Sequence, residues 1–206
     1  DVCSSDLQVL REQPPALQFL EELNFSNNYI GDEGMYHLSQ ALREQPQALQ
    51  FLEILRLYNN EIGDKGMEYL SQVFIKKPQA FQNLKELDLG SNRIGNEGMG
   101  HLARALREQP QALQSLTKLE LDKNIIEVEG MIHLSQALRE QPQAFQSLQK
   151  LNLENNQIEV EGMRHLLEAL REQSQALQSL QKLYLACNRI GVEGICHLDR
   201  KSTRLN

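Results

Sequence analysis

The sequence has little of what several large protein classes require. Three cysteines are too few for a disulfide framework. The formal net charge of −7 argues against a general binder of nucleic acid or of anionic membranes, because both need a basic surface. No glycine-rich phosphate loop, activated nucleophile or acid–base pair emerges, so a self-contained enzyme is the least favoured class.

Long apolar runs are also missing from the chain. No stretch is long enough to span a bilayer as a helix, and the first residues lack the pattern of a signal peptide. Hydrophobic residues make up 40% of the chain, which is enough for a core, while the mean hydropathy of −0.49 is low. This combination suits a thin, continuous core with much exposed surface.

What the chain does have is an internal repeat of 32 residues that returns six times. A fixed period of about 20–50 residues indicates a solenoid, a propeller or another array. One asparagine and one glycine mark every copy. They are Asn28, Asn60, Asn92, Asn124, Asn156 and Asn188, and Gly34, Gly66, Gly98, Gly130, Gly162 and Gly194.

Each copy begins with a strand motif. In the second copy Leu52, Leu55, Leu57, Asn60 and Ile62 form the pattern L-x-x-L-x-L-x-x-N-x-I. The alternation within this pattern predicts a short strand with one face directed inward. The other five copies align with it without gaps.

A helix is expected after each strand. In the first copy Met35, Leu38 and Leu42 recur at i, i+3 and i+7, which predicts one apolar helical stripe. Asp32 is the expected N-cap of this helix, and Pro46 is expected to end it. A strand, a helix and a parallel strand form a right-handed crossover.

Six such units predict an α/β fold, a curved right-handed solenoid or horseshoe. Helices need roughly 8–10 Å each and strands need roughly 4.8 Å, so the stack must curve. We therefore expect a parallel sheet on the concave side and helices on the convex side.

These residues resemble leucine-rich repeats. The long helix and the tail N-x-I-G-x-E-G-M-x-x-L-x-x-A-L are similar to the ribonuclease-inhibitor-like class, which includes the repeat domains of NOD-like receptors and of Ran GTPase-activating protein. The resemblance covers residues 8–198 and implies a cytoplasmic protein. This repeat is a few residues longer than is usual in the class, and the extra residues lie in the Gln-Pro-Gln-Ala-Leu-Gln connector.

The repeat stops at both ends of the chain. We expect residues 8–198 to form the repeat array, as a fragment without caps, and residues 1–7 and 199–206 to be non-native flanking segments. The alternative is natural flanking sequence. Because a solenoid needs polar terminal repeats over its core, uncapped ends predict self-association.

Several residues that stand out in the sequence have structural explanations. The asparagines are expected to form a ladder that satisfies backbone groups of their own turn and the next. The glycines are explained by close approach of a neighbouring repeat. Cys187 and Cys196 are interpreted as incidental reduced thiols.

One repeat position carries a row of histidines. Neighbouring helices lie roughly 8–10 Å apart, which is too far for two of these histidines to share a zinc ion, so no metal or cofactor site is predicted. The row is His37, His101, His133, His165 and His197, with Tyr69 in the remaining copy.

The copies differ most at the outward strand positions, which form three columns across the predicted concave face. The first column is Glu22, Ile54, Glu86, Lys118, Lys150 and Lys182. The second is Asn24, Arg56, Asp88, Glu120, Asn152 and Tyr184. The third is Ser26, Tyr58, Gly90, Asp122, Glu154 and Ala186. We expect Glu120, Asp122 and Glu154 to screen the three neighbouring lysines of the first column.

The columns predict a partner-binding surface of mixed charge with an acidic centre, because solenoids typically bind through extended concave surfaces. The alternative is a solvated sheet face. The candidate binding residues are Arg56, Tyr58, Asp88, Glu120, Asp122, Lys150, Glu154 and Tyr184.

The favoured function is therefore a non-enzymatic protein-binding module with a protein partner of unknown identity, and with no nucleic-acid or membrane partner. The resemblance implies the ligand-sensing or regulatory array of a larger intracellular protein. One alternative is a GTPase-activating regulator similar to Ran GTPase-activating protein. Another is an inhibitor or scaffold for a basic protein partner.

Overall fold

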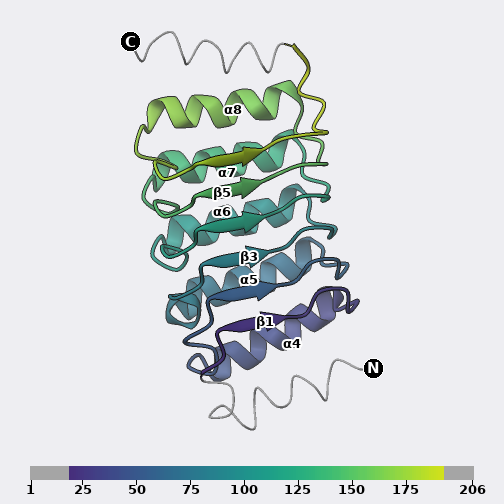
Figure 1. Ribbon diagram of the computed structural model, residues 1–206, viewed down its shortest axis with the longest axis vertical. Coiled ribbons are helices and arrows are strands. Elements are labelled where there is room, and N and C mark those ends of the chain that lie inside the picture. Colours follow the sequence, from purple (N-terminus) through teal and green to yellow (C-terminus); the bar gives the residue numbers. More distant parts are fainter. Residues whose placement is uncertain (1–18, 193–206) are drawn as a thin grey trace.

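The computed structural model describes residues 19–192 as a series of short strands and helices (Figure 1). The strands are β1 (Glu22–Asn24), β2 (Ile54–Arg56), β3 (Glu86–Asp88), β4 (Lys118–Glu120), β5 (Lys150–Asn152) and β6 (Lys182–Tyr184). The α-helices in these residues are α4 (Gly31–Glu44), α5 (Asp64–Lys76), α6 (Asn96–Glu108), α7 (Val128–Glu140) and α8 (Glu159–Glu172). A 3₁₀ helix, η1 (Pro78–Phe81), follows α5.

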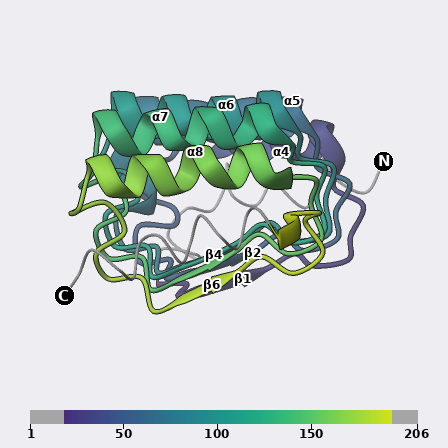
Figure 2. The same cartoon turned by 90° about the horizontal axis from the view of Figure 1, so that it is seen from above.

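All six strands form one parallel sheet in the order β1-β2-β3-β4-β5-β6. Each strand pairs with the strand 32 residues later, so that Leu23, Leu55 and Leu87 are aligned. The helices cover one face of the sheet (Figure 2). Successive strands point the same way and each helix returns behind them, so every crossover is right-handed, as predicted (Figures 1 and 2).

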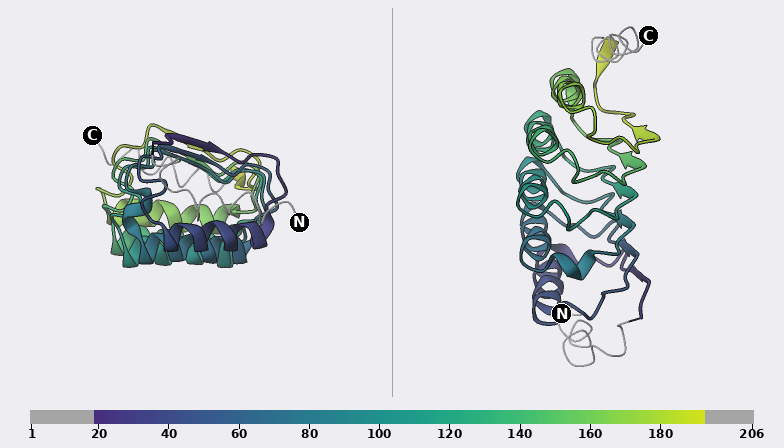
Figure 3. Two further views of the ribbon diagram at one scale, coloured as in Figure 1. Left: turned by 90° about the horizontal axis from the view of Figure 1, so that it is seen from below. Right: turned by 90° about the vertical axis from the view of Figure 1, so that its left-hand side faces the viewer.

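The stack is curved. Figure 3 shows the helices along the longer, outer side of the arc and the strands along the inner side. This agrees with the different widths of helices and strands. The predicted solenoid with a concave parallel sheet is confirmed. The sixth predicted helix and the predicted flanking segments 1–7 and 199–206 lie outside the described residues.

A single core lies between the sheet and the helices. The predicted helical stripe is confirmed, since Met35, Leu38 and Leu42 are buried. The inward residues of the second strand motif, Leu55 and Leu57, are buried against them. The four methionines that follow Met35 at the same position are also fully buried. They are Met67, Met99, Met131 and Met163.

The prediction that Asp32 is the N-cap of its own helix is wrong. α4 begins at Gly31, and its N-cap residue Ile30 makes no side-chain hydrogen bond. Asp32 lies in the first turn, where its Oδ1 accepts hydrogen bonds from the N–H groups of Gly63, at 2.7 Å, and Gly66, at 2.8 Å. The carboxylate therefore caps the helix of the next repeat, which begins one residue after Gly63.

The same bridge joins the next repeats along the stack. Asp64 Oδ1 accepts from the N–H of Gly98 at 2.9 Å, and Asn96 Oδ1 accepts from the N–H of Gly130 at 2.9 Å. Val128 holds this position in α7, and its side chain cannot accept a hydrogen bond. The cap is therefore interrupted between α7 and α8.

The repeated glycine is explained by this bridge. A Cβ at Gly66 would lie 2.7 Å from Asp32 Oδ1, and one at Gly98 would lie 2.6 Å from Asp64 Oδ1. Real Cβ atoms do not approach other atoms so closely. The predicted close approach of a neighbouring repeat is confirmed. The approaching group is the capping side chain at Gly66, Gly98 and Gly130, and it is Met131 at Gly162, where the cap is missing.

The predicted asparagine ladder is confirmed with one change of direction. Asn92 Nδ2 donates to the carbonyl of Leu89 in its own turn, at 3.0 Å, and to that of Leu57, at 2.9 Å. Its Oδ1 accepts from the N–H groups of Asn60 and Ile62, both at 3.0 Å. Each of the five later asparagines, Asn60, Asn92, Asn124, Asn156 and Asn188, thus serves its own repeat and the preceding one, because the loop of the preceding repeat lies against its amide.

Candidate functional site on the concave face

The three predicted columns lie side by side on the concave face. Strand register places Glu22, Ile54 and Glu86 in one column and Asn24, Arg56 and Asp88 in the next. The same register holds through β6. The third column continues just past the strands, where backbone bonds such as Asn59 N–H to Gly90 O, at 3.0 Å, keep the repeats aligned.

Arg56 is the centre of an ion-pair chain at the N-terminal half of the face. Its guanidinium contacts Glu22 on one neighbouring strand and Glu86 on the other, the latter at 3.2 Å. Glu86 also accepts from Lys118 Nζ at 3.1 Å. Glu86 therefore screens the charge of Lys118. From the sequence we expected Glu120, Asp122 and Glu154 to screen this lysine.

Asp88 lies in the middle of the face and is partly buried. Its Oδ1 accepts from the N–H of Gly90 at 3.0 Å, which fixes the carboxylate at the end of β3. Burial raises the pKa of Asp88, and the negative charges of Glu120, Asp122 and Glu86 raise it further, against the opposing effect of the Gly90 bond. The predicted acidic centre thus consists of carboxylates close enough to affect one another.

Lys150 connects the acidic centre to an aromatic residue. Its Nζ lies 2.5 Å from Glu120 Oε1 and 5.1 Å from the centre of the Tyr184 ring, which is 37% exposed. Burial lowers the pKa of Lys150, but the hydrogen bond and charge of Glu120 outweigh it and leave the pKa raised. The lysine is therefore held as a cation between a carboxylate and a ring face.

Asp122 and Glu154 are joined through Asn152. Asn152 Nδ2 donates to Asp122 Oδ1 at 3.3 Å, and its Oδ1 accepts from the N–H of Glu154 at 3.1 Å. Sequence reasoning placed Asn152 in its column but did not count it among the candidate binding residues. The amide orients both acidic positions, so it belongs to the surface that they form.

Tyr58 contacts a residue that sequence reasoning missed. Lys123 Nζ donates to Tyr58 Oη at 3.3 Å and lies 5.7 Å from the ring centre. The contact spans two repeats because Gly90 stands between them, and a Cβ there would meet both Asp122 Oδ1 and the Tyr58 ring. The signal available in the sequence was the lack of a side chain at Gly90.

The eight candidate residues therefore lie on one continuous surface but form separate contacts. Arg56 pairs with glutamates of the first column, while Glu120, Lys150 and Tyr184 form a second chain of contacts. Tyr58 reaches forward to Lys123. No contact in residues 19–192 joins Arg56 directly to Tyr184, since three strands lie between β2 and β6.

Among residues 19–192, no group of three or more His, Cys, Asp or Glu side chains could hold a metal ion. None of the helices described is both long and apolar enough to cross a membrane. Cys187 is an exposed free thiol. His197 and Cys196 lie outside the described residues.

Many solved structures share this fold, and two of them are compared with this chain. The tropomodulin C-terminal domain of Caenorhabditis elegans is 21% identical, with a TM-score of 0.55, and the match covers 86% of this chain and 96% of that one. The leiomodin-1 domain described as actin-binding site 2 is 16% identical, with a TM-score of 0.51, and the match covers 100% of this chain and 94% of that one. A search of curated proteins gave no match.

The leucine-rich repeat family matches the sequence at five places. These are residues 16–39, 48–71, 82–103, 146–167 and 176–195, which together make up more than half of the chain. The copy that contains β4 and α7 is not among them, although it has the same strand and helix as its neighbours. These matches do not test the finer resemblance to NOD-like receptors and Ran GTPase-activating protein, which stays a prediction. The chain belongs to the leucine-rich repeat family.

Proposed function

We propose that this chain is a non-enzymatic protein-binding module that takes its partner on the concave face. The observation that carries the proposal is the contrast between scaffold and surface. The inward strand residues and the ladder asparagines are nearly constant, and those from Leu55 to Asn156 are all buried, whereas the outward positions differ from copy to copy. A scaffold that holds variable side chains on one curved sheet is the arrangement that solenoid proteins use for binding.

The residues on this face suit a protein partner. Tyrosine and arginine are enriched at the energetic centres of interfaces, and Arg56, Tyr58 and Tyr184 all lie here. The leiomodin-1 domain with this fold is an actin-binding site, which gives a precedent for a protein partner on the fold. We further propose that the module is the ligand-sensing or regulatory array of a larger cytoplasmic protein.

Site-specific photo-cross-linking tests the proposal. A benzophenone amino acid replaces Tyr58 or Tyr184 on the concave face, and in a matched control it replaces Gln136, an exposed residue of α7 on the convex side. In cells that express the protein, we expect the same protein adduct from both concave positions and not from Gln136. Adducts that form equally well from Gln136 would contradict a concave binding face.

A second candidate, an inhibitor or scaffold for a basic protein, is favoured by the acidic centre. Three carboxylates act together on Asp88, so a cation from a partner would relieve their repulsion. Binding should then weaken steeply with salt and be lost on Asp88→Lys or Asp122→Lys. Binding that is independent of salt would rule this candidate out. The GTPase-activating alternative stays a prediction, and hydrolysis assays with a panel of small GTPases test it.

A further inference from the structure

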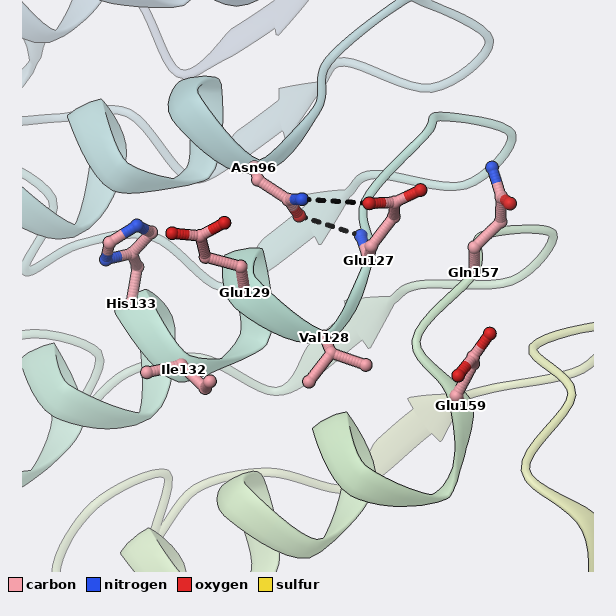
Figure 4. A pocket seen from close by; sticks show the side chains of 8 residues that line it. All are labelled: Asn96, Glu127, Val128, Glu129, Ile132, His133, Gln157 and Glu159. Atoms are coloured by element: carbon pink, nitrogen blue, oxygen red, sulfur yellow. Dashed lines mark hydrogen bonds between the residues drawn. The ribbon is translucent and has the colours of Figure 1, made fainter.

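A hollow of about 520 Å³ lies between the N-terminal ends of α7 and α8, away from the concave strand residues (Figure 4). Its lining includes Val128 and Ile132 from α7 and Glu159 from the start of α8. Its volume falls within the range of roughly 300–1,000 Å³ that is usual for ligand sites. The hollow is therefore a second candidate contact region, separate from the concave face.

The hollow lies where the repeat changes. A hollow of about 380 Å³ also lies at the equivalent place between α4 and α5, where Asp32 Oδ1 accepts from the N–H of Gly63, and it is lined by Asp32, Glu33, Tyr36, Lys65 and Tyr69. Val128 replaces the capping residue, and the N–H of Glu159 bonds instead to the carbonyl of Asn188 at 2.9 Å. The hollow at α7 therefore has the apolar side chains of Val128 and Ile132 where the earlier one has Asp32 and Tyr36, and no lysine lines it as Lys65 does there.

The floor of the hollow is apolar. Val128 is partly exposed and Ile132 is 36% exposed, although both belong to a helix whose other large apolar side chains are buried. Figure 4 shows Val128 between Glu129 and Glu159, with Ile132 further along the same helix, below Glu129. An exposed isoleucine and valine gain from contact with another apolar surface.

The rim of the hollow is acidic. Glu127, Glu129 and Glu159 all line it, and no lysine or arginine is among the described residues that do so. Asn96 Nδ2 donates to Glu127 Oε2 at 3.0 Å and holds that carboxylate at the edge (Figure 4). Two helix N-termini contribute roughly half a positive charge each, so three carboxylates leave the hollow negative.

We propose that this hollow binds an arginine side chain of a partner protein. The planar guanidinium is weakly hydrated and can lie on Val128 and Ile132, while its N–H groups donate to the carboxylates of Glu127 and Glu159. A lysine would place a strongly hydrated point charge over the same apolar floor, which is a poorer match. The hollow is a second contact region, and its occupation does not require a ligand on the concave face.

Methyl NMR of the full 206-residue chain tests the proposal with defined probes. The probes are three blocked tripeptides, Gly-Arg-Gly, Gly-Lys-Gly and Gly-citrulline-Gly, in which citrulline is the uncharged counterpart of arginine. We expect saturable shifts at Val128 and Ile132 with the arginine peptide, a weaker response with the lysine peptide and none with the citrulline peptide. Equal responses to the arginine and citrulline peptides would overturn the proposal.

Variants separate the hollow from the concave face. Glu127→Gln and Glu159→Gln should each weaken binding of the arginine peptide by roughly two- to fivefold, the range for an exposed ion pair. Asp122→Asn is the matched control on the concave face and should leave the affinity unchanged. An affinity that falls with Asp122→Asn but not with the two glutamine variants would assign the arginine to the concave face and refute the hollow.

Discussion

Asp64 holds the first turn of the next repeat's helix through the backbone of Gly98. Its Oδ1 accepts from the Gly98 N–H at 2.9 Å, and a Cβ on that glycine would lie 2.6 Å from the same oxygen. The residue pair therefore works as a unit, because the glycine has to lack a side chain for the carboxylate to reach its backbone. Helix capping in this protein is a contact between repeats, and it adds to the cohesion of the stack.

Removal of this cap should destabilise the protein. Asp64→Ala leaves the N–H groups of Gly95 and Gly98 without the carboxylate, and loss of a cap costs about 1 kcal/mol of unfolding free energy. Denaturant titration followed by circular dichroism measures the loss. Asp64→Asn is the matched control and should retain most of the stability, because Asn96 makes the same bridge one repeat later. Equal stability of Asp64→Ala and the parent would show that the bridge contributes nothing.

The start of α8 carries a residue in an unfavourable backbone conformation. Glu159 has a φ of +59°, whereas glycine holds the equivalent positions Gly31 and Gly191, with φ of +59° and +62°. A left-handed conformation costs a residue with a Cβ about 1–2 kcal/mol. We expect Glu159→Gly to raise the free energy of unfolding by about 1 kcal/mol in the same titration, after the entropic cost of glycine is deducted.

The control for this prediction is Glu127→Gly. Glu127 occupies the same position one repeat earlier but has a φ of −112°, which any residue adopts. Glycine there relieves no strain, adds freedom to the unfolded chain and removes the exposed hydrogen bond from Asn96, so stability should stay the same or fall slightly. A gain of similar size in both variants would mean that the effect comes from the lost charge and not from the backbone.

The sequence predicts the parts of this structure that depend on the 32-residue repeat. The alternation around Leu55 and Leu57 gives strand and sheet face, and a fixed step of 32 residues aligns every column without further information. The partner of Asp32 was assigned wrongly because local rules place a first-turn acid at its own helix, while the geometry of stacking decides which helix it reaches. Lys123 was missed for the same reason, since Tyr58 lies two repeats away.

The asparagine ladder should be costly to interrupt in the middle of the stack. Asn124 Nδ2 donates to the buried carbonyls of Leu89, at 3.0 Å, and Leu121, at 3.1 Å, and its Oδ1 accepts from the Ile94 N–H at 2.9 Å. Asn124→Ala leaves these buried groups without a hydrogen-bond partner and out of reach of water. Each unpaired buried group costs about 1–3 kcal/mol. We expect a loss of about 3 kcal/mol in unfolding free energy, measured by denaturant titration.

The first copy provides the control for the ladder. Asn28 holds the equivalent position, but it is exposed, and within residues 19–192 its Nδ2 donates to carbonyls of its own turn alone, those of Phe25 and Ser26. Water can replace these bonds, so Asn28→Ala should cost less than about 1 kcal/mol. Similar losses in the two variants would indicate that the ladder acts through its own turn and not through the preceding repeat.

Asp88 should make the stability of the array depend on pH in a defined direction. Its folded-state pKa is raised above the ordinary value of 3.8, first by burial and then by Glu120, Asp122 and Glu86. A group with a raised folded-state pKa favours folding below its unfolded pKa, and this contribution is lost as the pH rises through the folded-state pKa. Ionised Asp88 therefore opposes folding at neutral pH.

Asp88→Asn should remove this penalty and keep the structure. Asn24 and Asn152 hold the same column and accept from the N–H two residues later, at 3.0 and 3.1 Å, as Asp88 does. We expect the variant to be more stable than the parent at pH 7 by a few tenths to about 1 kcal/mol, the range for like charges on neighbouring strands. The gain should shrink as the pH falls and disappear below about pH 3.9, where the aspartate is protonated in both states. Thermal or denaturant unfolding of both proteins between pH 3 and pH 7 measures it, and a difference that stays constant over this range would show that the charge of Asp88 is not its cause.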